Sequence, residues 1–206
     1  MVHDAKAWIF DLDGTLFDTQ GPFHAKAEAT VLANHGIIME PKEISRRFSG
    51  VHTLEVFRQL APECDPQILL DEKWRRMKAI TILSPIRAID RAPYLIHQLY
   101  NQGITMGIAS ASPIFWILMC LTSIHVAPYF ECYTSVDEVE HGKPAPDVFL
   151  LAAERLKCAP KDCIAVEDGR AGVHAALAAG MQTYWLTTSS ETIIGAKKIT
   201  SLSELI

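Results

Sequence analysis

Two aspartates that stand one residue apart, Asp11 and Asp13, are the residues of this sequence best suited to chemistry. They directly follow a short apolar run, and Gly14 after them permits a sharp turn. Two carboxylates in this setting can hold a hard cation while one carboxylate oxygen stays free for nucleophilic attack. An isolated Asp-x-Asp is most often a solvated acidic turn, so the interpretation depends on residues farther along the chain.

Three later groups of polar residues stand after apolar runs or before predicted helices. Ser110 ends one apolar run, and its hydroxyl with nearby free backbone amides suits an anionic group. Lys143 lies in a loop stiffened by two prolines, just ahead of a predicted helix. Glu167 and Asp168 end another apolar run, and two adjacent acids there suit a magnesium ion. Ligands of open α/β sheets bind beyond the carboxyl ends of the strands, so we expect one shared site.

The scaffold that must position these residues is predicted from the order of the apolar runs. Short runs alternate with longer helical stretches, which is typical of a parallel sheet with crossover helices. Prolines at positions 113 and 146 suit helix starts, because a first-turn residue needs no N–H. The predicted fold class is therefore α/β. The expected strands are residues 7–10, 104–109, 163–166 and 182–186, with a weaker one at residues 131–134.

Residues 19–85 follow a different pattern, without a convincing strand. They are predicted to form helices joined by turns that contain Pro and Gly. A block of helices inserted after the first strand is expected to lie as a cap over the edge of the sheet. We therefore predict a catalytic core of residues 1–18 plus 86–206 and a helical cap domain of residues 19–85. The expected cap helices are residues 22–35, 41–48 and 52–60 and a longer helix capped by Asp65.

The composition excludes several classes of protein. Of the 206 residues, 49% are hydrophobic and 21% charged, as in globular proteins, which excludes a disordered or fibrous chain. The net charge of -5 argues against a nucleic-acid or anionic-membrane surface. The five cysteines form no CxxC pair, and no signal peptide or membrane span is visible. We expect a cytoplasmic monomer with no nucleic-acid or membrane partner.

The ordered set of polar residues resembles the haloacid dehalogenase (HAD) superfamily of phosphatases and mutases. The family's first motif, Asp-x-Asp-Gly-Thr/Val, corresponds to residues 11–15, its Ser/Thr motif to Ser110 and its lysine to Lys143. Glu167 and Asp168 match its acidic pair. The resemblance covers nearly the whole chain and implies a Rossmann-like core with a parallel sheet. The insertion is similar to the small helical cap of the subgroup that contains beta-phosphoglucomutase and the sugar-phosphate phosphatases.

The resemblance also implies a role for each motif residue. Asp11 would be the nucleophile that forms an aspartyl phosphate, and Asp13 the acid toward the leaving oxygen and the base toward water. That acid role requires a protonated Asp13, so its surroundings are expected to raise its pKa. Lys143 and Ser110 would stabilise charge on the transferring phosphoryl group. Mg²⁺ is the implied cofactor, held by Asp11, the Asp13 carbonyl, Glu167 and Asp168.

Substrate choice is expected to depend on the cap. The turn after residue 48 is similar to the specificity loop of the family, although arginines there also suit a helix end with exposed carbonyls. The last cap helix carries several cations, most of which are expected to form a solvated face while one could reach a substrate, with Trp74 and Met77 facing inward. Those cations are Lys73, Arg75, Arg76 and Lys78. The candidate substrate-binding residues are Gly14, His24, Arg46, Gly50, His52 and Ala111.

Three positions depart from the pattern of the family. Gly169 follows the acidic pair, where many relatives carry a serine. Asp90 and Arg91 stand where Pro-Gly is common. The segment between Asp18 and His24 is one residue longer than usual, which shifts the register of the histidine that mutase relatives use near Asp13.

Together these features predict a Mg²⁺-dependent phosphomonoester hydrolase acting on a small sugar or sugar-alcohol phosphate. A beta-phosphoglucomutase is the alternative, since it shares every core residue and differs in the group that receives the phosphoryl. A phosphate-binding regulatory protein without turnover is the alternative from another class. A calcium loop of the EF-hand type is excluded, because the positions that need an acid, glycine and glutamate hold Thr15, Leu16 and Pro22.

Overall fold

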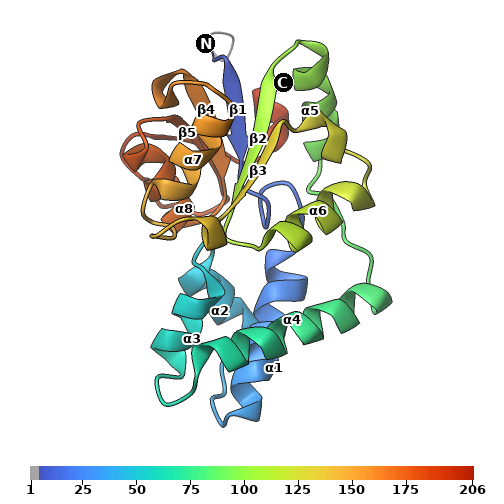
Figure 1. The fold of residues 1–206 in the computed structure, drawn as a ribbon, viewed down its shortest axis with the longest axis vertical. Coiled ribbons are helices and arrows are strands. Elements are labelled where there is room, and N and C mark those ends of the chain that lie inside the picture. Colours follow the sequence, from blue (N-terminus) through green and yellow to red (C-terminus); the bar gives the residue numbers. More distant parts are fainter. Residues whose placement is uncertain (1–4) are drawn as a thin grey trace.

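Six parallel strands form the centre of the larger part of the molecule, in the order β3-β2-β1-β4-β5-β6 (Figure 1). The computed structural model describes residues 5–206. The predicted α/β class is confirmed, and the five expected strands are present within one residue of their predicted ends. A sixth, with the sequence Ala-Lys-Lys-Ile, was not predicted because it lacks an apolar run. The strands are β1 (Ala7–Phe10), β2 (Thr105–Ser110), β3 (Cys132–Ser135), β4 (Cys163–Glu167), β5 (Gln182–Leu186) and β6 (Ala196–Ile199).

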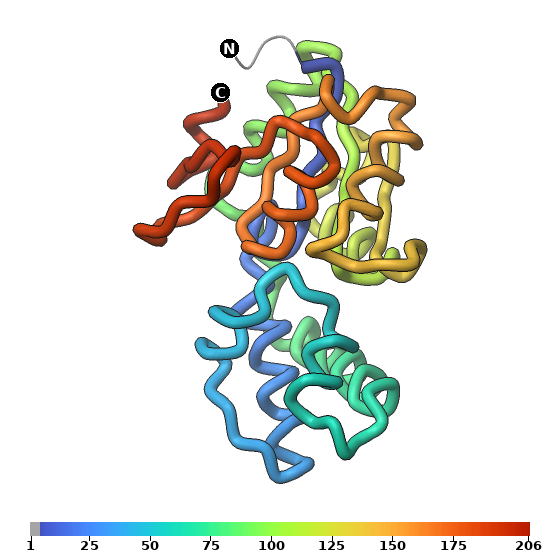
Figure 2. Tube along the Cα trace, turned by 90° about the vertical axis from the view of Figure 1, so that its left-hand side faces the viewer, coloured from blue at the N-terminus to red at the C-terminus, as the bar shows by residue number. Residues whose placement is uncertain are grey.

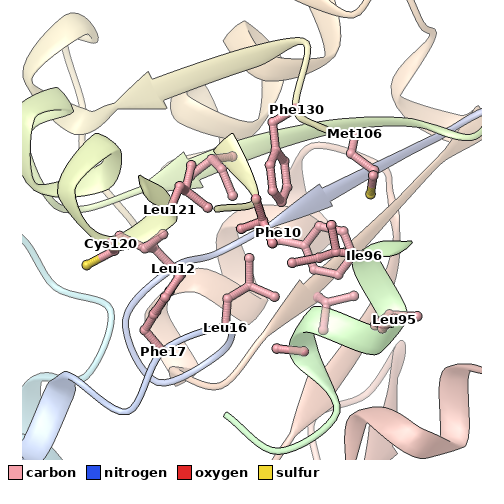
Figure 3. Packing of buried hydrophobic residues seen from close by; sticks show 14 of the residues in the cluster. Phe10, Leu12, Leu16, Phe17, Leu95, Ile96, Met106, Cys120, Leu121 and Phe130 are labelled. Atoms are coloured by element: carbon pink, nitrogen blue, oxygen red, sulfur yellow. The ribbon is translucent and has the colours of Figure 1, made fainter. Parts of the chain in front are cut away.

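Helices cover both faces of this sheet. Successive residues of a strand point to opposite faces, so a strand that is apolar throughout needs a covering layer on each side. Trp8 and Phe10 belong to one buried cluster, together with helices α5 (Ala92–Asn101) and α6 (Ile114–Ser123), part of which Figure 3 shows. Ile9 belongs to the cluster of the other face, with α7 (Asp147–Arg155) and α8 (Arg170–Ala178). All four residues of β1 are buried, as expected for a strand covered on both faces.

Residues 20–83 form a separate group of helices, here named the insertion, beyond one end of the sheet (Figures 1 and 2). It has its own buried apolar cluster, which includes Leu32, Ile44 and Phe57. The two segments that join it to the sheet run side by side, with the Asp18 N–H donating to the Arg87 carbonyl at 2.9 Å. Its elements are the π-helix η2 (Gln20–Ala25) and helices α1 (Lys26–Asn34), α2 (Pro41–Phe48), α3 (Thr53–Leu60) and α4 (Pro66–Leu83).

Arg91 shows how one departure from the family pattern is accommodated. Its φ of 69° lies in the left-handed region, where glycine is the favoured residue, and it directly precedes α5. The substitution therefore changes a turn and leaves the helix in place. The remaining short helices are η3 (Ala127–Tyr129), η4 (Val136–Glu138), η5 (Pro160–Asp162) and η6 (Leu202–Leu205). Among residues 5–206, no helix is both long enough and apolar enough to span a bilayer.

Candidate active site

The register of the central strands brings the motif residues to one edge of the sheet. Phe10 pairs with Ile108 on one side and with Val166 on the other, so β1, β2 and β4 end together. Asp11 follows β1, and its N–H donates to the Val166 carbonyl at 3.0 Å. Ser110 and Glu167 are the last residues of β2 and β4. The prediction that these side chains lie at the carboxyl ends of neighbouring parallel strands is confirmed.

Lys143 lies between two of these carboxylates. Its Nζ donates to Asp11 Oδ1 at 2.6 Å and to Glu167 Oε1 at 2.7 Å. The side chain comes from the loop before α7 and is buried. Burial by itself would lower the pKa of Lys143, but the two carboxylates raise it above the ordinary lysine value. Lys143 is therefore a fixed positive charge beside Asp11.

Two buried carboxylates, Asp11 and Glu167, and the half-buried Asp168 are grouped around this single ammonium group. Oxygens of Asp11, Glu167 and Asp168 all lie within 4.8 Å of one another. Burial, and then the neighbouring acids, raise the pKa of Asp11 to about 8 and that of Asp168 to about 7. All three can be ionised together at neutral pH only if more positive charge is supplied. Oxygen donors with surplus negative charge suit a divalent cation of the Mg²⁺ type, so the residues present fit the implied metal.

Gly14 shapes the loop that lets Asp168 approach. Its φ is 98°, and a Cβ built on it would lie 2.3 Å from Asp168 Oδ2. Thr15 donates its hydroxyl to the other oxygen, Asp168 Oδ1, at 3.0 Å. A side chain at position 14 would therefore displace a carboxylate of the acidic cluster.

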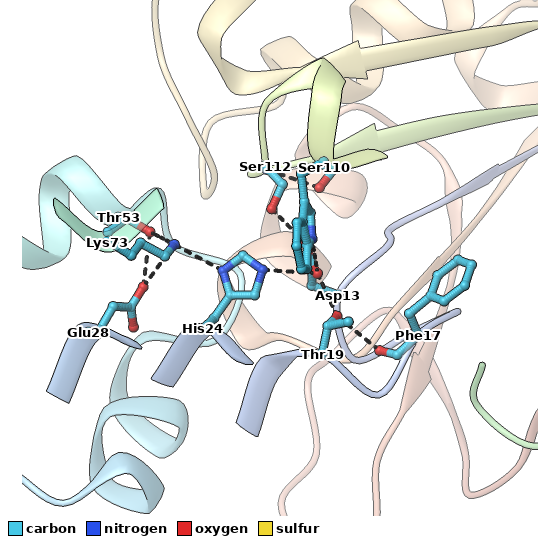
Figure 4. A network of polar contacts seen from close by, with 10 residues as sticks. Asp13, Phe17, Thr19, His24, Glu28, Thr53, Lys73, Ser110 and Ser112 are labelled. Carbon is cyan, nitrogen blue, oxygen red and sulfur yellow. Dashed lines mark hydrogen bonds and ion pairs between the residues drawn. The ribbon is translucent and has the colours of Figure 1, made fainter. Parts of the chain in front are cut away.

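Asp13 faces the insertion and is surrounded by hydrogen-bond donors (Figure 4). Its Oδ1 accepts from the Thr19 hydroxyl at 2.5 Å and from Trp116 Nε1 at 2.8 Å. The His24 Nε2 lies 3.1 Å from the same oxygen. The Ser112 hydroxyl donates to Oδ2 at 2.6 Å.

These donors make the charged form of Asp13 the stable one. Burial alone would raise its pKa, but the His24 ring and the hydroxyls of Ser112 and Thr19 outweigh it and lower the pKa below the ordinary range. The expectation that the surroundings raise this pKa was wrong. The sequence does not show that four side chains from two distant segments, residues 19–24 and 112–116, converge on one carboxylate.

His24 reaches Asp13 despite the longer segment before it. Residues 20–25 form a π-helix, whose wider turn takes up the additional residue. Single π-turns of this kind are frequent at functional sites. The shifted register predicted from the sequence is thus absorbed in the backbone before His24.

A buried lysine holds the other side of the His24 ring. Lys73 Nζ lies 2.9 Å from His24 Nδ1, donates to the Thr53 hydroxyl at 2.5 Å and lies 3.2 Å from Glu28 Oε1. An ammonium group only donates, so Nδ1 must accept and the ring proton sits on Nε2, which donates to Asp13. Lys73 is 1% exposed, so it does not belong to the solvated face expected for most cations of this helix.

The space between the sheet edge and the insertion is a cavity lined by residues of both parts. Of the predicted site residues, Asp11, Asp13, Ser110, Ala111, His24 and Gly50 line it. Gly14, Arg46 and His52 do not. Arg46 is exposed because Ile44 and Phe48 occupy the buried face of α2, and the His52 ring turns to Asp137, with Nε2 3.3 Å from Oδ1. Their roles in substrate binding stay predictions.

Comparisons with known proteins agree with this arrangement. Residues 8–186 match the model of the haloacid dehalogenase-like hydrolases. The chain belongs to this family. Fructose-1-phosphate phosphatase YqaB of Escherichia coli (strain K12) is 31% identical over 177 residues, covering 84% of this chain and 92% of that protein. Hexitol phosphatase A of the same strain is 30% identical over 190 residues, covering 91% and 85%.

A solved structure resembles the fold of this HAD-like hydrolase closely. Beta-phosphoglucomutase from Clostridium difficile superposes with a TM-score of 0.87, over 98% of this chain and 93% of that one. The two chains are 22% identical, so the similarity concerns the fold. The superposition supports the predicted α/β fold.

Gly169, where many relatives carry serine, contacts the turn between α2 and α3. A Cβ at this position would lie 2.8 Å from the Ser49 carbonyl oxygen, so the turn could not come as close to a larger residue. Ser49 itself donates its hydroxyl to Asp168 Oδ2 at 3.2 Å. In this HAD-like hydrolase a hydroxyl from the insertion therefore reaches the acidic pair.

Several site residues were missed from the sequence. Lys73 stands three residues after Leu70 and four before Met77, so the helical spacing did place it on the buried face. Ser112 directly precedes Pro113 at a predicted helix start, and Trp116 lies in an apolar run, so neither stands out as a site residue. Ser49 lies in the turn after residue 48 that is similar to the specificity loop, but nothing there predicts its contact with the acidic pair. For Thr19 and Glu28 the sequence carries no distinguishing signal.

Proposed function

We propose that this HAD-like hydrolase is a Mg²⁺-dependent phosphatase acting on phosphate monoesters of small sugars or sugar alcohols. The observation that carries the proposal is the buried Asp11 carboxylate beside Lys143 at the sheet edge, with Glu167 and Asp168 within reach of the same cation. The names of the related fructose-1-phosphate and hexitol phosphatases support the substrate class.

A site that lets a carboxylate attack a phosphate ester must supply positive charge. A phosphate monoester is a dianion at neutral pH, and a carboxylate approaching it is repelled unless positive charge is present. Asp11, Glu167 and Asp168, with the carbonyl of Asp13, would hold Mg²⁺. The bound ion would neutralise part of the charge on the phosphoryl oxygens. Lys143 supplies the second positive charge from a fixed position.

In the first step the Asp11 carboxylate attacks phosphorus. A bond forms between Asp11 and phosphorus, and the bond to the ester oxygen breaks, which leaves an aspartyl phosphate. Ser110 accepts a hydrogen bond from the Ser112 N–H at 3.0 Å and can still donate its own hydrogen to a phosphoryl oxygen. The leaving oxygen takes up a proton as it departs.

In the second step water attacks the aspartyl phosphate. Asp13 takes the proton of the water while the bond between phosphorus and Asp11 breaks, which releases phosphate and restores Asp11. The low pKa keeps Asp13 ionised and so able to accept this proton, but it also makes Asp13 a weak base while all its donors are in place. To serve also as the acid of the first step, Asp13 must lose some of its four donors, so we expect the contacts of His24 or Ser112 to change between the steps.

The insertion acts in this proposal as a cap domain of residues 19–85 over a core of residues 1–18 plus 86–206. The cavity lies between the two, so substrate enters when the cap moves away from the sheet edge. The adjacent segments near Asp18 and Arg87 are the natural hinge. Closure would exclude water while Asp11 attacks.

A phosphorus NMR time course with Mg²⁺ and a panel of hexose, hexitol and deoxyhexose phosphates tests this function. We expect free phosphate to grow from at least one ester and growth to stop when magnesium is removed. Beta-glucose 1-phosphate with a trace of the bisphosphate belongs in the panel, because its conversion into the 6-phosphate would identify a mutase instead. Binding of phosphate esters without any conversion would favour the regulatory alternative.

A further inference from the structure

The part of the cavity that the insertion forms contains a carboxylate but no spare positive charge. Among the described residues, those lining the cavity include no lysine and no arginine. Glu28 on α1 lines it from the insertion, and Asp11 and Asp13 line it from the sheet edge. Apart from the catalytic end, where Mg²⁺ and Lys143 would bind the transferring phosphate, the cavity is therefore negative.

Lys73 lies behind this wall, but its hydrogen-bonding capacity is fully used. An ammonium group has three N–H donors. Those of Lys73 face the ring of His24, the hydroxyl of Thr53 and the carboxylate of Glu28 (Figure 4). Its charge is balanced by Glu28, and no donor remains for a second anionic group of a substrate.

Glu28, in contrast, has acceptor capacity to spare. Its Oε1 accepts from Thr53 at 3.0 Å and pairs with Lys73 at 3.2 Å. Its Oε2 accepts no hydrogen bond from any residue in the described range of 5–206. The side chain is 4% exposed and lines the cavity, and Oε2 is not one of the fully buried atoms without a partner, so this oxygen is accessible from the cavity. A ligand hydroxyl in the cavity can therefore donate a hydrogen bond to it.

We propose that Glu28 determines substrate specificity by accepting a hydrogen bond from a hydroxyl of the leaving group. The preferred substrates are monophosphates whose remaining part is a neutral polyol. Glu28 repels esters that carry a second phosphate or a carboxylate at the far end, because no positive charge in this part of the cavity compensates the additional negative charge. This inference rests on the proposed phosphatase function and adds the chemical class of the leaving group.

Matched ester pairs test it in the intact protein. Fructose 1-phosphate is compared with fructose 1,6-bisphosphate, and glucose 6-phosphate with 6-phosphogluconate, by kcat/KM with Mg²⁺. We expect the neutral member of each pair to be favoured by about 100-fold, since a buried unpaired charge opposes the other. Comparable kcat/KM values for both members would overturn the proposal without any variant.

Glu28→Gln then isolates the carboxylate, because it keeps the shape and removes the charge. We expect the preference for the neutral ester to fall at least about 10-fold, with the bisphosphate gaining and the monophosphate losing kcat/KM. Glu43→Gln, an exposed residue of α2, is the matched control and should leave both ratios unchanged. A folded Glu28→Gln protein with the wild-type preference would overturn the proposal.

Loss of all turnover points to a different failure. If the wild-type protein hydrolyses none of the esters, the proposed phosphatase function is wrong. Calorimetric binding of the same pairs to the wild-type protein then tests Glu28 by itself. Tighter binding of the neutral member would still support its specificity role, and equal affinities would overturn it.

Discussion

The site contains two buried lysine–carboxylate groups that differ in charge balance. At the sheet edge, Lys143 faces Asp11 and Glu167, with Asp168 beside them, so carboxylates are in excess. Across the cavity, Lys73 is balanced by Glu28, and Asp13 is held by neutral donors. We call the first the metal cluster (Asp11, Lys143, Glu167, Asp168) and the second the cap network (Asp13, His24, Glu28, Thr53, Lys73).

The pKa values follow from this difference. In the metal cluster, burial raises the pKa of Asp11 to about 8, because one lysine cannot compensate three acids. In the cap network, hydrogen bonds overcome burial and lower the pKa of Asp13. An added cation would complete the metal cluster, whereas in the cap network hydrogen bonds stabilise the charged Asp13 and fix its position.

The largest expected effect is on the nucleophile of the metal cluster. Asp11→Asn should lower kcat by about four orders of magnitude or more, because an amide cannot form the acyl phosphate. Phosphate release with Mg²⁺ measures this. Asp18→Asn, an exposed residue of the same segment, is the control and should retain the wild-type rate. Full turnover by the Asp11→Asn protein would refute the assignment.

The cap network should respond to loss of its lysine mainly in stability. Lys73→Met leaves Glu28 buried without its counter-charge, so unfolding free energy should fall by about 3–5 kcal/mol. Urea denaturation measures this. Lys78→Met, exposed on the same helix, should change stability by no more than about 0.5 kcal/mol. If Lys73→Met lowers the unfolding free energy no more than the control does, the pair of Lys73 and Glu28 does not contribute to stability.

Added Mg²⁺ should stabilise the folded protein by binding at the metal cluster. At about 100 times the dissociation constant, Mg²⁺ adds roughly 2.7 kcal/mol, which raises Tm by about 5–10 °C for a chain of this size. Asp168→Asn should abolish the increase, since a ligand is lost. His24→Asn should preserve it, because the His24 side chain is not one of the proposed ligands. Equal Tm increases with Mg²⁺ in the two variants would show that the metal cluster and the cap network do not differ in binding the ion.

The pH dependence of stability should show the same surplus of acids. The folded pKa values of Asp11 and Asp168, about 8 and about 7, exceed the unfolded value of 3.8. Their contribution to stability is therefore fully present below pH 3.8 and is lost as pH rises through 7 to 8. In metal-free protein, unfolding free energies from pH 5 to pH 8 should fall less in Asp168→Asn than in wild type.

The smallest expected effect is that of removing the Ser49 hydroxyl, which connects the insertion to Asp168 at the sheet edge. Ser49→Ala removes a donor to Asp168, so Mg²⁺ should bind about 10-fold more weakly in calorimetry. Ser45→Ala is the matched control on α2, because the buried Ser45 hydroxyl has no partner among residues 5–206. Unchanged Mg²⁺ affinity in Ser49→Ala would show that the insertion does not support the metal cluster.

Sequence reasoning correctly brought together the residues of the metal cluster, whose roles stay predictions, and it largely missed the contacts of the cap network. Asp11, Ser110 and Glu167 could be predicted because strand ends are marked by apolar runs, and parallel strands bring their ends together. The contacts of Asp13 depend on how the insertion is placed over the sheet, which local patterns do not encode. For Lys73 a local signal did exist, since its helical register places it on the buried face, but the residue was grouped with the cations of the solvated face.

Trapping the phosphorylated enzyme tests the central claim most directly. Wild-type protein with Mg²⁺ and a reactive sugar phosphate is quenched in acid within one turnover, digested and analysed by mass spectrometry. We predict one added phosphoryl group on Asp11, absent when magnesium is removed and absent in Asp11→Asn. Turnover with no phosphorylated peptide, or with the phosphoryl group on another residue, would contradict the account.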